Sequence, residues 1–341
     1  MSGTNRYHRQ TLFEPIGETG QERLMESHVL IVGAGALGSG SAEALVRAGI
    51  GKLTLIDRDY VEESNLQRQQ LFSEQDAYEK LPKAIGAKNR LNDINSMVEV
   101  EAIIADAGAD LLSELAPAID LIIDATDNFD IRMLVNDISQ KFEVPWIYGA
   151  CVASYGMTFT IIPGQTPCLQ CLQGYLPASG ATCDSVGVIQ PVVQHVVSYQ
   201  VTEAMKLLTG NRAQISGKLI AFDLWKNEHM EMEIEELKKP DCSSCSENRS
   251  YAHLSYGNQM KTTVMCGRDT VQIRPQHGIA NLSEVAENLR SNKNLQLSWN
   301  PYLLSIQDEN FRIVLFKDGR ALIHGTMDEM EAKNVYYRYM G

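Results

Sequence analysis

The most restrictive feature of the sequence is a glycine-rich turn between an apolar strand and a helix. Residues 29–32 form a short apolar, mostly β-branched run, as expected for a strand buried on both faces of a parallel sheet. Gly33, Gly35 and Gly38 follow with the spacing G-x-G-x-x-G, and residues 39–48 are predicted to form a helix of small residues. Such a turn lets the backbone approach phosphates at a helix N-terminus, so it predicts a nucleotide site in an α/β fold.

Strands and helices alternate through the first half of the chain. We predict strands at 52–56, 98–104 and 121–123, a strand-like region at 145–163, and helices at 17–25, 84–92, 131–141 and 190–208. The last helix is predicted because valines, Ala204 and Leu208 recur at helical spacing. This alternation is typical of a Rossmann-like, doubly wound α/β sheet.

The C-terminal quarter reads as a separate small α+β domain. The composition turns polar and cysteine-rich near residues 241–250, which predicts a domain of residues 1–250, with a nucleotide-binding core at about 28–165, and a second domain of residues 251–341. In the second domain we expect a strand at 263–273, a helix at 282–290, hairpin strands at 303–316 and 321–324, and a final helix at 328–339.

Composition excludes several functional classes. The chain has 341 residues and is 44% hydrophobic, which is enough to fold around one large core or two unequal ones. We find no run of 18 apolar residues and no signal-peptide pattern, so we expect a cytoplasmic protein without membrane association. The formal net charge of −13 argues against binding to nucleic acid or to anionic membranes.

Three polar residues bear on the nucleotide site, and two of them decide between NAD and ATP. Asp57 follows the second predicted strand, where a carboxylate would meet a ribose hydroxyl of either NAD or ATP. Arg68 and Lys83 favour ATP, because a triphosphate under attack by another anion needs cations near the developing charge. Each could also be an ordinary solvated side chain.

Asp127 is a candidate ligand for Mg²⁺. It lies just after the predicted strand 121–123, at the carboxyl end where parallel sheets bind their ligands. A second interpretation is that Asp127 caps the helix that begins near Asn128, and both roles can coexist in one residue.

Four of the seven cysteines form two Cys-x-x-Cys pairs, Cys168 with Cys171 and Cys242 with Cys245. Two such pairs favour a closed, tetrahedral Zn²⁺ site over a redox disulfide in a reducing compartment. A fifth cysteine, Cys183, lies among small residues in a segment that reads as a loop, where a thiolate could act as a nucleophile.

Six short segments together resemble the ThiF/MoeB/HesA adenylyltransferases, the bacterial relatives of the ubiquitin-activating enzymes. The segments are 6–10 (RYHRQ), 33–38 (GAGALG), 57–59 (DRD), 64–69 (SNLQRQ), 82–84 (PKA) and 124–128 (DATDN). Each segment is weak evidence alone, but their order and spacing are specific, and the resemblance covers about residues 5–247.

The resemblance implies roles for individual residues. Asp57 would bind the ribose of ATP, Asn65, Arg68 and Lys83 the phosphates, and Asp127 the Mg²⁺. Arg9 would reach the nucleotide of a neighbouring subunit, which implies a homodimer. The cysteine pairs would hold a structural zinc, and Cys183 would correspond to a loop cysteine that is proposed to bond covalently to the carrier in some members.

The substrate implied by the resemblance is a ubiquitin-like sulfur-carrier protein that ends in Gly-Gly, either ThiS for the thiamine thiazole or MoaD for molybdopterin. Its carboxylate would become an acyl-adenylate ready for sulfur transfer. Three alternatives stay open from the sequence: an NAD-dependent oxidoreductase, an inactive scaffold, and a superfamily member that activates a different carboxylate.

Overall fold

A computed structural model describes residues 6–175, 186–254, 263–264, 269–273, 281–290 and 295–340. The chain divides into two compact units, residues 1–257 and residues 258–341, and each is described by itself.

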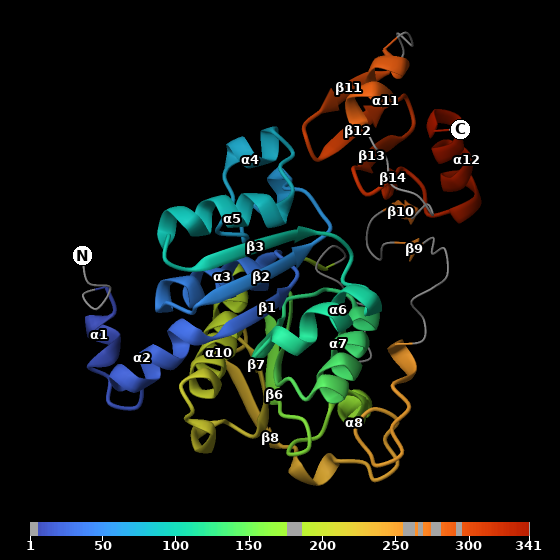
Figure 1. Ribbon diagram of the computed structural model, residues 1–341. Coiled ribbons are helices and arrows are strands. Elements are labelled where there is room, and N and C mark those ends of the chain that lie inside the picture. The colour runs from blue at the N-terminus through green and yellow to red at the C-terminus, as the bar shows by residue number, and fades with distance from the viewer. Residues whose placement is uncertain are drawn as a thin grey trace. The chain divides into compact units, whose positions relative to one another are not determined.

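The first unit is built on one eight-stranded sheet in the order β3-β2-β1-β4-β5-β6-β7-β8 (Figure 1). The strands β3 to β5 of this order run parallel to one another, whereas β6, β7 and β8 add on antiparallel. The strand bounds are β1 (His28–Val32), β2 (Lys52–Asp57), β3 (Glu99–Ile104), β4 (Leu121–Asp124), β5 (Trp146–Val152), β6 (Tyr155–Ile161), β7 (Lys218–Asp223) and β8 (Glu228–Glu233).

Helices cover both faces of this sheet. Apolar side chains of α2, α3, α5 and α10 form the core on one face, and those of α6, α7 and α8 form the core on the other. The helices are α1 (His8–Thr11), α2 (Gly17–Glu26), α3 (Ala36–Ala48), α4 (Glu74–Tyr78), α5 (Lys83–Ile94), α6 (Ala109–Leu115), α7 (Phe129–Phe142), α8 (Leu169–Leu172) and α10 (Gln190–Leu208). Short 3-10 turns are η1 (Glu63–Asn65), η2 (Ala116–Ala118), η3 (Gln173–Tyr175), η4 (Arg212–Gln214) and η5 (Glu235–Leu237).

The predicted doubly wound fold is confirmed, with one difference in the sheet. The helix at 190–208 has the predicted bounds, and the parallel strands agree with prediction within a residue or two. The antiparallel strands β7 and β8 were not predicted. The edge strand β8 is mostly exposed and alternates acidic residues with methionine and histidine, so it lacks the apolar pattern of a buried strand.

The second unit is a small antiparallel sheet in the order β11-β12-β13-β14-β10-β9, with two helices whose apolar side chains contribute to its core. Its elements are β9 (Thr263–Val264), β10 (Thr270–Ile273), α11 (Leu282–Leu289), β11 (Gln296–Trp299), β12 (Leu303–Gln307), β13 (Arg312–Phe316), β14 (Ala321–His324) and α12 (Glu329–Met340). The predicted single strand at 263–273 was wrong: it is two strands, β9 and β10, which pair antiparallel at Val264 and Val271. Strand β11 was not predicted either.

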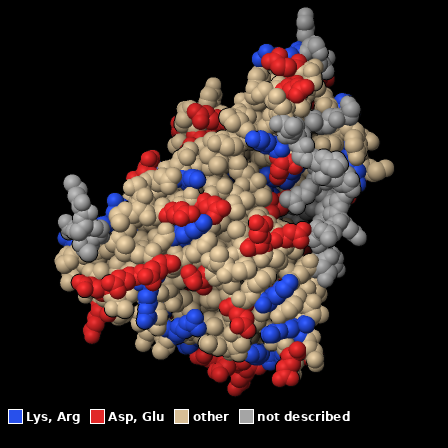
Figure 2. Space-filling view, viewed as in Figure 1, with Lys and Arg blue, Asp and Glu red and all other residues tan. Residues whose placement is uncertain are grey.

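The surface carries mixed charge. On the face drawn in Figure 2, lysine and arginine side chains lie singly or in small groups among aspartates and glutamates. Among the helices that the structure describes, none combines the length and the apolar character that crossing a bilayer requires.

Candidate active site

The glycine turn lies between the carboxyl end of β1 and the first turn of α3, and two of its glycines are sterically required. Gly33 has a φ of +97°, and a Cβ there would lie 2.6 Å from the Ala125 carbonyl oxygen. A Cβ on Gly38 would lie 1.9 Å from the Gly33 carbonyl oxygen, so any side chain would force the helix off the turn. Gly35 is different, because its nearest neighbour would be Gln69 at 3.9 Å. The space above Gly35 is therefore open to a ligand.

Asp57, at the end of β2, fastens the glycine turn to the next strand. One carboxylate oxygen accepts a hydrogen bond from the Ala34 amide at 2.6 Å, and the other accepts one from the Asp59 amide at 2.6 Å. Burial raises the pKa of Asp57, and the charge of Lys83 opposes that rise. An ionised carboxylate offers about four lone-pair sites, so two remain available for ribose hydroxyls.

Lys83 is buried at the start of α5, and its ammonium faces the same region. Its Nζ lies 3.3 Å from a carboxylate oxygen of Asp59, which neutralises it when no ligand is bound. Arg58 makes a parallel pair with Asp106 at 3.1 Å and interacts electrostatically with Asp127. Cations and acids from β2, α5 and the loops after β3 and β4 thus meet at the carboxyl edge of the sheet.

The segment 64–69 contributes three further side chains. Asn65 is buried, and its Oδ1 accepts from the Glu62 amide at 3.1 Å, which closes the turn η1. Arg68 is half-buried and donates to the Ser64 carbonyl oxygen at 2.8 Å. Gln69 was missed by the sequence reasoning: it is 4% exposed, its Oε1 has no partner, and its Nε2 faces Gly35. An unpartnered buried amide at the open glycine marks a polar ligand position.

Asp127 does not cap α7. Asn128 is the N-cap, since its Oδ1 accepts from the amides of Asp130 at 2.8 Å and Ile131 at 3.2 Å. Asp127 is exposed, and within the described part of the chain its carboxylate accepts no hydrogen bond. This leaves Asp127 available to a cation.

Arg132 is the second residue that the sequence reasoning missed. It donates to Asp124 at 2.9 Å, to the Thr126 carbonyl oxygen at 2.6 Å and to the Gly149 carbonyl oxygen at 3.0 Å. Asp124 is fully buried, and burial raises its pKa while the charge of Arg132 opposes that rise. Arg132 therefore fixes the loop that carries Asp127. The acceptors of Arg132 come from β4, the following loop and β5, so no local pattern in the sequence marks it.

Arg9 lies far from the site of its own chain. It belongs to α1, whose neighbours Tyr7 and Gln10 hydrogen-bond to Asn95 at 2.8 Å and to the Ala48 carbonyl oxygen at 2.9 Å. Ala48 and Asn95 are the C-terminal ends of helices that run antiparallel to the strands, so α1 lies at the amino edge of the sheet. The nucleotide site lies at the opposite, carboxyl edge. The structure thus brings Asp57, Lys83 and Asp127 to one edge and does not bring Arg9 there.

The two cysteine pairs converge beside the middle of α7. All four sulfur atoms lie within 4.8 Å of one another, with separations of 3.5 Å between Cys168 and Cys242, 3.5 Å between Cys171 and Cys245, and 3.9 Å between Cys168 and Cys171. A tetrahedral Zn²⁺ with bonds of about 2.3 Å requires sulfur separations of about 3.8 Å. The Lys239 amide also donates to Cys171 at 3.3 Å. The cluster thus fits zinc in both donor type and spacing.

Helix α7 holds both halves of this cluster. Asn136 accepts from the Leu169 amide at 2.8 Å, beside the first cysteine pair. Asp137 accepts from the Ser244 hydroxyl at 2.6 Å, between the second pair, and from the His253 amide at 2.9 Å. The helix that begins at the nucleotide edge therefore also supports the cysteine cluster beside its middle turns.

Cys183 lies outside the described residues, so its proposed role as a nucleophile stays a prediction.

The fold and the polar edge define a nucleotide-binding protein of the doubly wound α/β class. Comparison with known proteins makes the assignment specific. The chain belongs to the ThiF family, which residues 7–244 match. This membership removes the oxidoreductase alternative.

Individual relatives extend the likeness to the whole chain. The sulfur carrier protein ThiS adenylyltransferase of Bacillus subtilis is 50% identical over 339 residues, which cover 99% of this chain and 100% of that protein. The molybdopterin-synthase adenylyltransferase of Escherichia coli is 36% identical over 247 residues, which cover 71% of this chain and 96% of that protein.

A solved structure shows the same fold. The Escherichia coli protein MccB, crystallised with MccA-N7isoASN, has a TM-score of 0.62 and 24% identity, and the match covers 72% of this chain and 76% of that one. At this identity the likeness extends to the fold alone.

Proposed function

We propose that this chain is an ATP-dependent adenylyltransferase that activates the C-terminal carboxylate of a ThiS-type sulfur-carrier protein. The observation that carries the proposal is the 50% identity to the Bacillus subtilis protein across both units. The molybdopterin-synthase relative from Escherichia coli matches 71% of this chain. The small C-terminal unit is therefore shared with the ThiS-named relative, which favours ThiS over MoaD as the carrier.

The nucleotide would lie along the carboxyl edge of the sheet. Its phosphates would approach the open backbone at Gly35 and the N-terminus of α3, where the helix dipole favours negative charge. The ribose would take the free lone pairs of Asp57. Asn65, Arg68 and Lys83 would contact the phosphates, and Gln69 would add an amide near Gly35.

The reaction would need cations rather than a base. A carrier carboxylate is already ionised at neutral pH, so it can attack the α-phosphorus directly. The bond from that phosphorus to the β-phosphate oxygen breaks, pyrophosphate leaves, and an acyl-adenylate remains. Arg68 and Lys83 would offset the repulsion between the two anions, with Lys83 exchanging Asp59 for a phosphate oxygen.

Mg²⁺ would bind at Asp127. The exposed carboxylate, one residue before the cap of α7, is held in place through Arg132 and Thr126. Asp127 would hold the ion, which would supply positive charge to offset the negative charge of the departing pyrophosphate.

The active unit would be a homodimer. Arg9 cannot serve its own site, because α1 is anchored at the amino edge of the sheet. A second copy could bring its own Arg9 to the nucleotide. Zinc at the four cysteines would act structurally, since the cluster supports α7 and lies away from the polar edge.

Pyrophosphate exchange into ATP, measured with ThiS as the acceptor, tests the function. We expect Asp127→Ala and Arg68→Ala to lower the exchange rate by about 100-fold or more, because both act on charge that develops in the transition state. Asp130→Ala and Arg47→Ala are matched controls: the first removes an exposed acid from the first turn of α7, and the second removes an exposed arginine of α3.

Both controls should retain wild-type exchange. Full exchange in Asp127→Ala and Arg68→Ala would refute the proposed site. Exchange with MoaD but not with ThiS would refute the choice of carrier and leave the chemistry intact.

A further inference from the structure

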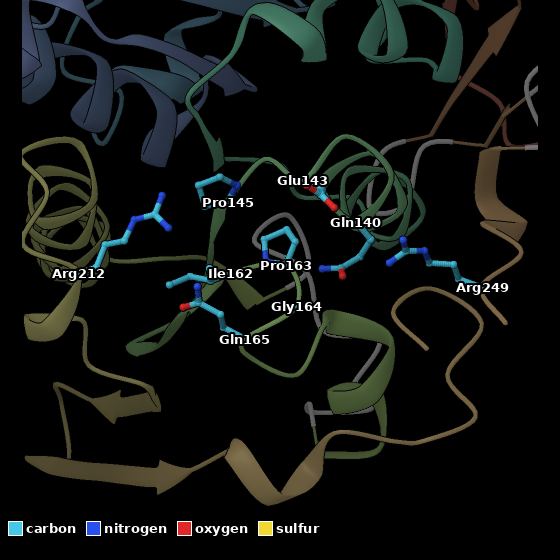
Figure 3. A pocket seen from close by; sticks show the side chains of 9 residues that line it. All are labelled: Gln140, Glu143, Pro145, Ile162, Pro163, Gly164, Gln165, Arg212 and Arg249. Carbon is cyan, nitrogen blue, oxygen red and sulfur yellow. The ribbon is translucent and has the colours of Figure 1, made fainter. Parts of the chain in front are cut away.

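A cavity of about 270 Å³ lies at the amino edge of the sheet, away from the nucleotide site (Figure 3). It is formed by the C-terminal end of α7, the start of β5, the loop after β6, the turn η4 and the segment after the last zinc-site cysteine. Its lining residues are Gln140, Glu143, Pro145, Ile162, Pro163, Gly164, Gln165, Arg212 and Arg249. The volume is close to the lower limit for small-molecule sites, which suits a ligand of a few heavy atoms.

Gln140 gives this cavity a buried donor that nothing satisfies. The side chain is 2% exposed, and its Nε2 has no hydrogen-bond partner. Figure 3 shows the side chain of Gln140 between Pro163 and Arg249, with its amide group on the side of Pro163. A buried amide nitrogen without a partner costs about 1–3 kcal/mol, so a group that accepts its hydrogen bond is expected in the cavity.

Charged side chains without partners surround the same space. Among the residues that the structure describes, neither Arg212, Arg249 nor Glu143 forms an ion pair, although the cavity is lined by all three. Arg249 lies 5.9 Å from the ring of Tyr251, whose hydroxyl donates to the Gln140 carbonyl oxygen at 3.5 Å. Tyr251 thus holds Arg249 beside Gln140. Arg212 and Arg249 are exposed and Glu143 offsets one of their charges, so the lining carries a small positive charge in a chain whose net charge is −13.

We propose that this cavity binds a small organic carboxylate, at a site separate from that of ATP. The carboxylate would accept a hydrogen bond from Gln140 Nε2 and would be attracted by the charges of Arg249 and Arg212, which lie on opposite sides of the cavity, while Ile162 and Pro163 would contact its apolar part. Glu143 leaves the lining with a formal charge of +1, which equals in size the single negative charge of a carboxylate.

A titration with acetate tests the site directly. Full-length protein labelled with ¹⁵N-glutamine would be titrated at constant ionic strength, and the side-chain amide resonance of Gln140 would be assigned by its loss in Gln140→Met. We expect a saturable shift with a dissociation constant in the millimolar range, and inorganic phosphate is titrated in parallel as the competing anion. Arg249→Ala and Arg212→Ala should each weaken acetate binding about tenfold, because each removes a positive charge from the lining.

Arg47→Ala serves as the matched control, since it removes an exposed arginine that does not line the cavity, and it should bind acetate like the wild type. Lys83→Ala should also bind normally, which separates this site from the nucleotide site. A shift that rises linearly without saturating, or equal affinities in wild type, Arg249→Ala and Arg212→Ala, would overturn the proposal. Tighter binding of phosphate than of acetate would overturn the assignment of a carboxylate.

Discussion

The polar carboxyl edge of the large sheet and the cysteine cluster beside α7 differ in how their charges are balanced. At the carboxyl edge three cations already have an acid beside them: Lys83 pairs with Asp59, Arg58 with Asp106, and Arg132 with Asp124. In the cysteine cluster four sulfur atoms lie within 4.8 Å of one another. The three cations are therefore balanced by the protein's own acids, whereas the cysteine cluster needs a metal ion to be stable in its thiolate form.

This difference predicts that activity depends on the carboxyl edge and stability on the cysteine cluster. Loss of a nucleotide contact should lower turnover and leave folding intact. Loss of the metal should unfold the region that the cluster ties together, which includes α7, the loop after β6 and the segment around Cys242. Helix α7 connects the carboxyl edge to the cysteine cluster.

The largest effect is expected from breaking the metal cluster. Cys168→Ala should abolish binding of one zinc per chain and lower the free energy of unfolding by on the order of 5 kcal/mol, because a buried closed site loses a ligand. Metal analysis and thermal unfolding measure both quantities. Cys151→Ala, a half-buried cysteine outside the cluster, is the matched control and should retain its zinc. One zinc per chain in Cys168→Ala would contradict the assignment.

Arg132→Ala should give the next largest effect. Unlike the other variants at the carboxyl edge, it should lower both stability and activity. It leaves the fully buried Asp124 without its ion pair, so we expect a loss of about 3–5 kcal/mol in unfolding free energy. Pyrophosphate exchange should fall as well, since the loop that carries Asp127 loses its anchor.

The control for Arg132 is again Arg47→Ala, which breaks an exposed pair with Glu43 and should cost less than about 1 kcal/mol. Arg132→Lys should recover part of the stability but less of the exchange, because one ammonium cannot reach all three acceptors. Wild-type stability of Arg132→Ala in urea denaturation would show that the buried pair does not matter.

The glycine turn and the cysteine cluster were predicted from the sequence because both are encoded by short local patterns. The spacing of Gly33, Gly35 and Gly38 and the pairing of cysteines within Cys-x-x-Cys reflect short-range geometry. The parallel strands were found because they are continuous apolar runs. Strand β8 was not predicted because an exposed edge strand has no continuous apolar run.

The missed site residues depend on tertiary packing. Gln69 matters because its amide faces Gly35, more than 30 residues earlier in the chain. Arg132 matters because its acceptors come from β4, the following loop and β5. Sequence spacing alone does not reveal which buried polar group lacks a partner, and the same holds for Gln140.

The smallest effect concerns Asp57 and the dependence of stability on pH. Burial raises its pKa in the folded state above the ordinary value of 3.8, so the folded protein holds that proton more tightly than the unfolded chain. The stability contributed by Asp57 is therefore fully present below pH 3.8 and is lost as pH rises through its folded pKa.

Asp57→Asn removes this dependence, so its stability relative to wild type should rise with pH above 3.8 and then level off. Urea denaturation of both proteins between about pH 4 and 7 measures the trend, with the exposed Asp93→Asn as control. A relative stability that falls with rising pH would mean that the charge of Lys83 lowers the pKa of Asp57 more than burial raises it. The charges at the carboxyl edge would then be balanced more strongly than the ion pairs of Lys83, Arg58 and Arg132 imply.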